Sequence, residues 1–196
     1  LGSGVRTAAI SRIMTQGDAS NTGNPYDLMI QGSGYFHVVM PDGTDAYTRA
    51  GNFALSPDGQ IVTDKGYTVA PGVAVPSNAL SMTVNAQGQV MATLPGQSAP
   101  QTLGQLELVR FPNEGGLSAQ GDNLFTETQS SGSPQAGVPG AAGYGTIQQG
   151  YLETANVNPV EEVTALITAQ RAYEMNSKVV TAADDMMQTT SRMGGS

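Results

Sequence analysis

The C-terminal end of the chain has a different local pattern from everything before it. From Asn156 to Met193 there is no Gly and, after Pro159, no Pro, whereas the earlier residues form short apolar runs separated by Gly-containing turns. Asn158 suits a helix N-cap, Pro159 the first helical position and Glu161 the third position of a capping box. This pattern predicts a helix from Pro159 to Met193, about 50 Å long at about 1.5 Å per residue.

The residues before this helix predict a β-meander. Tyr26–Met40 contains two runs of aromatic and β-branched residues divided at Gly32–Gly34, and the tripeptide Pro-Asp-Gly occurs at 41–43 and 57–59. Gly supplies the positive φ that a tight hairpin requires. The further strands are expected around 45–48, 52–55, 60–63, 67–70, 81–84 and 89–94, with a longer one over Thr102–Phe111.

These patterns predict a mainly β fold, meander-like or sandwich-like, with a long C-terminal α-helix. We expect a β-rich domain over residues 1–150, a helical unit over residues 151–193 and a flexible tail over residues 194–196. The β-rich domain includes a Gly/Pro/Ser-rich segment, 129–145, which lacks charge and large side chains and is predicted to be an extended surface loop.

Apolar side chains occur around most of the circumference of the predicted helix, and polar residues interrupt each possible seam. A helix with this distribution is normally covered on several sides. The alternatives are a two-stranded coiled coil, a helix folded back onto its own sheet, and a helix packed among copies of itself. The residues expected to form the contact are Val163, Leu166, Ile167, Tyr173, Val180, Met186 and Met187.

Composition excludes several classes of function. The formal net charge is -8, from 8 basic and 16 acidic residues, and this acidity argues against binding to nucleic acid or to an anionic membrane. The chain has no Cys, so it has neither a disulfide framework nor a thiolate site, and it lacks the apolar run that a membrane-inserted helix needs.

The sequence offers no set of catalytic or metal-binding residues. His37 is the only histidine, which excludes a site with several histidine ligands, and it lies in a strand-like run where a packing role is favoured. The acidic residues Asp42, Asp45, Asp58 and Asp64 lie at or beside turns without the spacing of a calcium loop. We therefore expect no enzyme activity, no cofactor and no metal site.

Two blocks of sequence resemble a known family. The first, Tyr26–Val69, contains YTRAGNF followed by DGQIVT, and the second, Gln149–Val180, contains GYLETANVN followed by ITAQRAYEMNSK. Together they resemble the bacterial flagellar rod and hook proteins, the axial family of the basal body. The second block, with FPNEGGLSAQGDNLFTETQSSG upstream of it, is most similar to the distal-rod members of that family.

The resemblance implies a structural subunit of a helical tube that spans the periplasm and transmits torque. The β-rich part would be an outer domain and the C-terminal helix an axial helix that lines the tube. The implied partners are copies of the same chain, other axial proteins (proximal rod and hook) and the ring proteins that surround the rod. Members of this family leave the cell through the flagellar export apparatus.

The resemblance also implies an N-terminal helix before Leu1 that pairs with the C-terminal helix, and without it we expect the chain to polymerise poorly. The sequence leaves two alternative functions. One is a hook or proximal rod subunit of the same family. The other is a secreted domain that binds glycan or peptidoglycan, which would need an exposed aromatic platform, and the chain has no Trp.

Overall fold

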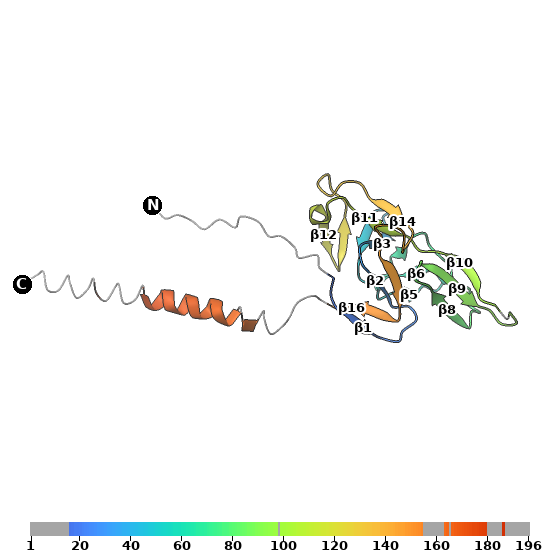
Figure 1. Ribbon diagram of the computed structural model, residues 1–196, viewed down its shortest axis with the longest axis horizontal. Helices are drawn as coiled ribbons and strands as arrows, with labels where there is room; N and C mark the ends of the chain where they lie inside the picture. Colours follow the sequence, from blue (N-terminus) through green and yellow to red (C-terminus); the bar gives the residue numbers. More distant parts are fainter. Residues whose placement is uncertain (1–15, 98, 155–162, 165, 180–185, 187–196) are drawn as a thin grey trace, which may run out of the picture. The chain divides into compact units, whose positions relative to one another are not determined.

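The computed structural model describes residues 16–97, 99–154, 163–164, 166–179 and 186. The chain divides into two units, Leu1–Ala155 and Asn156–Ser196. All described strands belong to the first unit, and residues 166–179 of the second form an uninterrupted stretch of α-helix (Figure 1). The predicted class, mainly β with a C-terminal helix, is confirmed.

The largest sheet has nine antiparallel strands. They are β3 (Tyr35–Val39), β4 (Asp45–Thr48), β5 (Ala54–Leu55), β6 (Ile61–Val62), β7 (Thr68–Val69), β11 (Leu108–Arg110), β12 (Ser118–Gly121), β13 (Leu124–Thr126) and β14 (Gln135–Gly137). The main path runs β12-β13-β4-β3-β7-β6-β5, and β11 pairs with both β3 and β14. The sheet is open, so its strands do not close into a barrel.

Three smaller sheets complete the β-domain. One contains β8 (Ser81–Val84), β9 (Gln89–Thr93) and β10 (Gln101–Gln105), which Figure 1 shows together at one end of the domain. A second pairs β2 (Leu28–Gln31) with β15 (Thr146–Gln149). The third pairs β1 (Ala19–Asn21) with β16 (Tyr151–Glu153), so the first and last described strands of the domain lie side by side.

Most predicted strands and turns are present. The strands expected at 45–48 and 81–84 match β4 and β8, and the two Pro-Asp-Gly turns have Gly43 and Gly59 at φ values of 82° and 79°. The single strand expected over Thr102–Phe111 is wrong, because β10 and β11 belong to different sheets. Between them, the amide of Leu106 donates to the carbonyl of Gly88 at 2.8 Å and its side chain is fully buried, which turns the chain inward.

Two segments differ from their predicted descriptions. Residues 129–145 contain β14 and the buried residues Ser131 and Pro139, so this segment is more than an extended surface loop. Its small residues permit close packing, because a Cβ on Gly137 would lie 2.4 Å from the ring of Tyr144. Residues 151–153, which were expected in the helical unit, form β16.

The hydrophobic core lies between the sheets and has two parts. The larger part joins side chains from the large sheet, the β2–β15 pair and the sheet of β8, β9 and β10, including Leu28, Phe36, Val69, Val90 and Leu108, each at most 1% exposed. The smaller part is mainly aromatic and contains Tyr35, Tyr47, Val109, Phe111 and Leu117. In it the ring of Phe111 meets those of Tyr35 and Tyr47 edge to face, at centroid distances of 6.1 and 4.8 Å.

The two tyrosines of the smaller cluster make the stability of the domain sensitive to alkaline pH. Burial, with the carboxylates of Asp45 and Glu127 as smaller causes, raises the pKa of Tyr47 from 10.0 to about 12. Burial and the neighbouring Glu114, which accepts a hydrogen bond from the Tyr35 hydroxyl at 3.2 Å, raise the pKa of Tyr35 further. Both shifts favour the neutral form in the folded state.

We therefore expect the free energy of unfolding to be unaffected by these groups below about pH 10 and to fall as the pH rises through about 12, because the unfolded state then loses its protons first. Urea denaturation at pH values from 9 to 12 would measure this slope. The Tyr47→Phe variant should show a smaller slope over the same range, and an unchanged slope would refute the assignment.

Candidate assembly site

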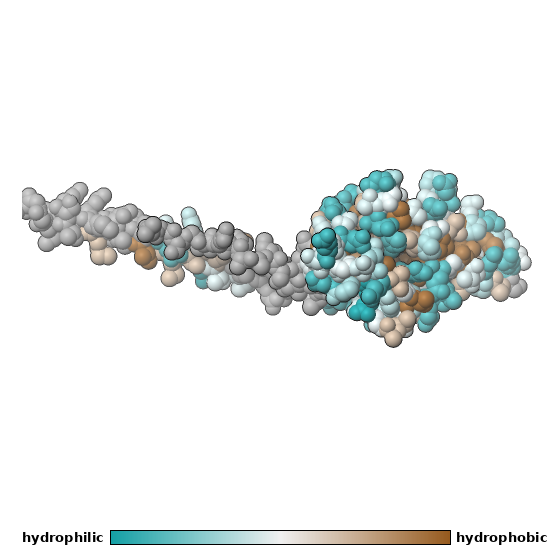
Figure 2. All heavy atoms as spheres, turned by 90° about the horizontal axis from the view of Figure 1, so that it is seen from above, coloured by the Kyte–Doolittle hydropathy of each residue, from teal (hydrophilic) through white to brown (hydrophobic). Residues whose placement is uncertain are grey.

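The helical residues that the sequence singles out are exposed on their own unit. Val163, Leu166, Ile167 and Tyr173 are 56%, 61%, 44% and 77% exposed, and Met186 is 68% exposed. Figure 2 shows brown and tan side chains, among white and teal ones, at the surface of this segment. Val180 and Met187, which belong to the same predicted set, lie outside the described residues.

Exposed apolar residues lie on at least two faces of the helix over residues 166–179. At about 100° per residue, Leu166 and Tyr173 lie on one face, since they are seven positions apart. Met175 and Val179, which are 66% and 65% exposed, lie on nearly the opposite face. Met175 does not belong to the contact set predicted from the sequence. A helix with two such faces offers contacts to neighbours on two sides.

The segment Tyr47–Phe53, YTRAGNF, has a structural role at nearly every position. Tyr47 packs in the aromatic cluster, and the ring of Phe53 meets that of Phe36 edge to face at 5.0 Å. Thr48 is buried, and its hydroxyl accepts a hydrogen bond from the amide of Ala50 at 3.0 Å. This segment thus connects both parts of the core.

Arg49 connects the first block of sequence to the second. Its guanidinium lies 3.0 Å from Oε2 of Glu153, which is in β16 and 104 positions farther along the chain. Neither residue could be predicted as a candidate, because an ion pair over this separation leaves no periodicity or spacing in the sequence that would reveal it.

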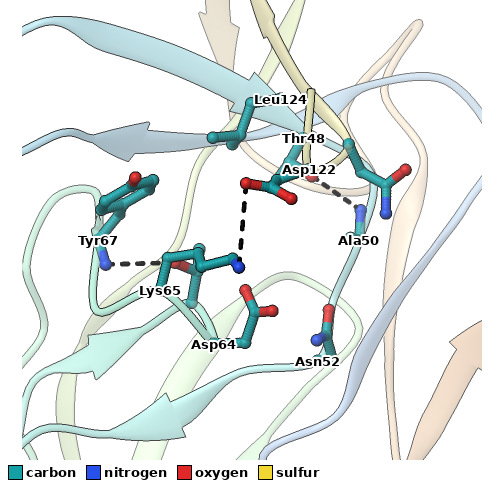
Figure 3. Close-up of a pocket in the computed structure, with 10 residues that line it drawn as sticks. Thr48, Ala50, Asn52, Asp64, Lys65, Tyr67, Asp122 and Leu124 are labelled. Carbon is teal, nitrogen blue, oxygen red and sulfur yellow. Dashed lines mark hydrogen bonds and ion pairs between the residues drawn. The ribbon is translucent and has the colours of Figure 1, made fainter. Parts of the chain in front are cut away.

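A small polar hollow of about 130 Å³ lies beside the same segment (Figure 3). Its lining includes Asp64, Lys65 and Asp122, and the Lys65 ammonium lies 4.0 Å from the Asp122 carboxylate. Both charged side chains of this pair are about half exposed, so the contact is weakly stabilising. Within the described part of the chain, no group of three or more His, Cys, Asp or Glu residues is arranged to hold a metal ion.

His37 takes part in a cross-strand contact of the large sheet. Its Nε2 lies 2.8 Å from Oδ1 of Asp45, and its ring stacks on that of Tyr47 at 5.4 Å. The acidic residue at the Pro-Asp-Gly turn, Asp42, accepts a hydrogen bond from the amide of Thr44 at 2.9 Å, which lowers its pKa. These contacts belong to the strand pair and its turn. Within the described residues, no helix has the length and the apolar character needed to cross a membrane.

Comparison with known proteins gives matches over nearly the whole chain. Residues 29–92 match the family model described as flagellar hook protein FlgE/F/G D1 domain, and residues 148–193 match the one described as flagellar basal body rod FlgEFG protein C-terminal. These matches include most of both blocks of sequence that the sequence analysis compared with the axial family.

Individual relatives support the same family and also distinguish between its members. The flagellar basal-body rod protein FlgG of Caulobacter vibrioides is 52% identical over 98% of this chain and 74% of its own length. FlgG of Bacillus subtilis is 37% identical over 96% of this chain and 72% of its own length. FlgF of Caulobacter vibrioides is 34% identical over 90% of this chain and 68% of its own length.

The identity to FlgG of Caulobacter vibrioides therefore exceeds the identity to FlgF of the same organism, over a larger share of the chain. The resemblance to the axial family, and within it to the distal rod protein, is confirmed. The chain belongs to the flagellar basal-body rod proteins, the FlgE/F/G family of structural subunits.

Proposed function

We propose that this protein is the structural subunit of the flagellar distal rod, assembling with copies of itself into a helical tube that spans the periplasm and transmits torque. The observation that carries the proposal is the 52% identity to a FlgG protein over 98% of the chain. The remaining partners would be the proximal rod and hook proteins at the two ends of the tube and the ring proteins around it. Delivery through the flagellar export apparatus belongs to the same proposal.

The helical unit supports a role in assembly. Its described residues carry large apolar side chains on two faces and bury none of them within the unit. Exposed apolar side chains of this number favour burial against other helices, since each would contribute roughly 1.5–3 kcal/mol when fully covered. The two faces favour a position among several helices over a simple two-stranded coiled coil.

The work of such a subunit is mechanical, and we propose no turnover chemistry for it. The contact residues remain those predicted from the sequence, Val163, Leu166, Ile167, Tyr173, Val180, Met186 and Met187, to which the exposed Met175 and Val179 are added. In this proposal residues 151–154 link the outer β-domain to the axial helix.

The rival functions lack a supporting observation. A glycan-binding surface needs exposed aromatic rings, and among the described residues of the β-domain the exposed large apolar side chains are Leu80 and Val138, neither aromatic. A hook or proximal rod subunit agrees less well with the higher identity to FlgG than to FlgF.

Deletion of the gene tests the proposal. Cells without the protein should be non-motile and should build basal bodies that end before the distal rod, and re-expression should restore both the rod and swimming. Electron microscopy of purified basal bodies would measure the length of the rod. Full-length rods in the deletion strain would refute the proposal.

A further inference from the structure

The two strands through which the chain enters and leaves the β-domain, β1 and β16, form what we call the terminal ribbon. All three side chains of β1 are exposed, and those of β16 are only half-buried. Apolar burial therefore contributes little to its attachment, and an isolated pair of strands is marginally stable in water. Polar contacts must hold the ribbon against the rest of the domain.

Arg49 makes the strongest of these contacts. Its Nε donates to Oε2 of Glu153 at 3.0 Å, and its Nη2 lies 3.0 Å from the same oxygen, while its Nη1 donates to the carbonyls of Gly32 and Gly34 at 3.1 and 3.0 Å. The side chains of Arg49 and Glu153 are only 23% and 15% exposed. A half-buried pair with this many charge-assisted hydrogen bonds is stronger than an ordinary surface ion pair.

The same carboxylate also holds the N-terminal side of the ribbon. Oε1 of Glu153 accepts a hydrogen bond from the amide of Gly17 at 2.9 Å. The side chain of Gln16 donates to the carbonyl of Ile30 at 2.8 Å and accepts from the amide of Gly32 at 3.0 Å. Residues 30–34 thus make hydrogen bonds both to Arg49 and to Gln16, which precedes the ribbon.

The other end of the ribbon is attached by backbone contacts at a buried residue. The amide of Gly150 donates to the carbonyl of Asp27 at 2.8 Å, and the hydroxyl of Thr22 donates to the Asp27 carboxylate at 2.6 Å. Asp27 is 6% exposed and bridges to Asn52 in the segment that contains Arg49. The ribbon is therefore fastened at both ends to residues 49–52 and their neighbours.

The geometry points to Arg49 and Glu153 as positioning residues of a joint that fixes the terminal ribbon, and with it residues 16–21 and 151–154, to the large sheet. Any load applied to either end of the chain enters the domain through residues 16–21 or 151–154. Arg49, which follows directly on β4 of the large sheet, holds residues 151–154 through its contact with Glu153, and Glu153 in turn holds residues 16–21 through the amide of Gly17. As part of a rod subunit, which rests on the proposed function, the joint would carry force between the outer domain and the axial helix.

The Arg49→Lys substitution distinguishes a local role of Arg49 in the joint from a contribution to the stability of the whole domain. Arg49→Lys keeps the charge but loses the planar fork, so a single ammonium cannot reproduce all the hydrogen bonds of the guanidinium. We expect hydrogen exchange of the amides that flank and fasten the ribbon, those of Gly17, Thr22 and Thr154, to accelerate about tenfold or more in this variant and in Glu153→Gln. Amides of β3 and β4 should keep their protection.

The exposed ion pair between Lys65 and Asp122 provides the matched control. Lys65→Gln removes the exposed contact to Asp122 and should leave the exchange of the ribbon unchanged. If the amides of the ribbon exchanged at the same rate in Arg49→Lys as in the parent protein, the proposed joint would be refuted. Equal acceleration throughout the domain would also overturn it, since Arg49 would then contribute only to overall stability.

Swimming cells test whether the joint carries load. In cells whose only copy of the gene encodes Arg49→Lys, basal bodies should form, and swimming speed should fall more steeply than in the parent strain as the medium becomes more viscous. Equal speeds at high viscosity would overturn the load-bearing role. Detection of the variant in purified basal bodies separates the two proposals. Absence of the protein from them would contradict the proposed function, whereas its presence with an unchanged speed would contradict the load-bearing joint.

Discussion

Substitution of Leu166 or Tyr173 by Asp is expected to prevent incorporation of the protein into rods while the β-domain stays folded. Both side chains are mostly exposed, at 61% and 77%, so a carboxylate at either position should cost the isolated unit little. In an assembled rod the same carboxylate would lie against an apolar neighbour. Burial of an unpaired charge costs several kcal/mol, and about 1.4 kcal/mol corresponds to a tenfold change in an equilibrium constant.

The measurement compares the amount of the variant in purified basal bodies with its amount in whole cells, and circular dichroism of the isolated chain reports the fold of the β-domain. Asn176→Asp is the matched control, because it introduces the same charge at a polar, exposed position of the same helix. Met175→Asp examines the opposite face in the same way. Normal incorporation of the Leu166 and Tyr173 variants would show that this face is not an assembly contact.

The sequence predicts the local elements of this protein well, because each depends on neighbouring residues. The turns at Gly43 and Gly59 follow from the Pro-Asp-Gly tripeptides, and β4 and β8 follow from runs of suitable side chains bounded by such turns. The division of Thr102–Phe111 into β10 and β11 could not be predicted, since the apolar pattern continues across Leu106 while the partners of the two strands differ. Only the tertiary contacts of Leu106 decide where the chain turns.

The candidate site likewise has one part that the sequence predicts and one part that it does not. Apolar periodicity indicates the candidate contact residues of the helix, because their spacing along one helix determines which of them share a face. The joint between Arg49 and Glu153 has no such signal, since its parts come from three separate segments of the chain. The sequence does show that both residues lie in the blocks that resemble the axial family, but it does not show that the blocks meet. The fold is needed to bring them together.

Gly51→Ala is expected to destabilise the β-domain by about 3–5 kcal/mol, the range of severe substitutions in a packed core. A Cβ on Gly51 would lie 1.6 Å from the carbonyl oxygen of Leu28, so the two backbones would have to separate. That separation would stretch the hydrogen bond from the Leu28 amide to the Gly51 carbonyl, now 2.9 Å, and pull the fully buried Leu28 from the core. For a chain of this size the melting temperature should fall by roughly 10 °C.

Gly115→Ala is the control that shows whether the destabilisation by Gly51→Ala comes from the close approach of the Leu28 carbonyl. Gly115 also lacks a positive φ, but the nearest atom to its added Cβ would be Oδ1 of Asn113 at 3.5 Å, an ordinary contact. We expect this variant to lie within about 1 kcal/mol of the parent protein. Thermal melts of the two variants under identical conditions would measure the difference. If they melted together, the Leu28 backbone would have room to move, and Gly51 would not be required for the packing of β2 against the segment that carries Arg49.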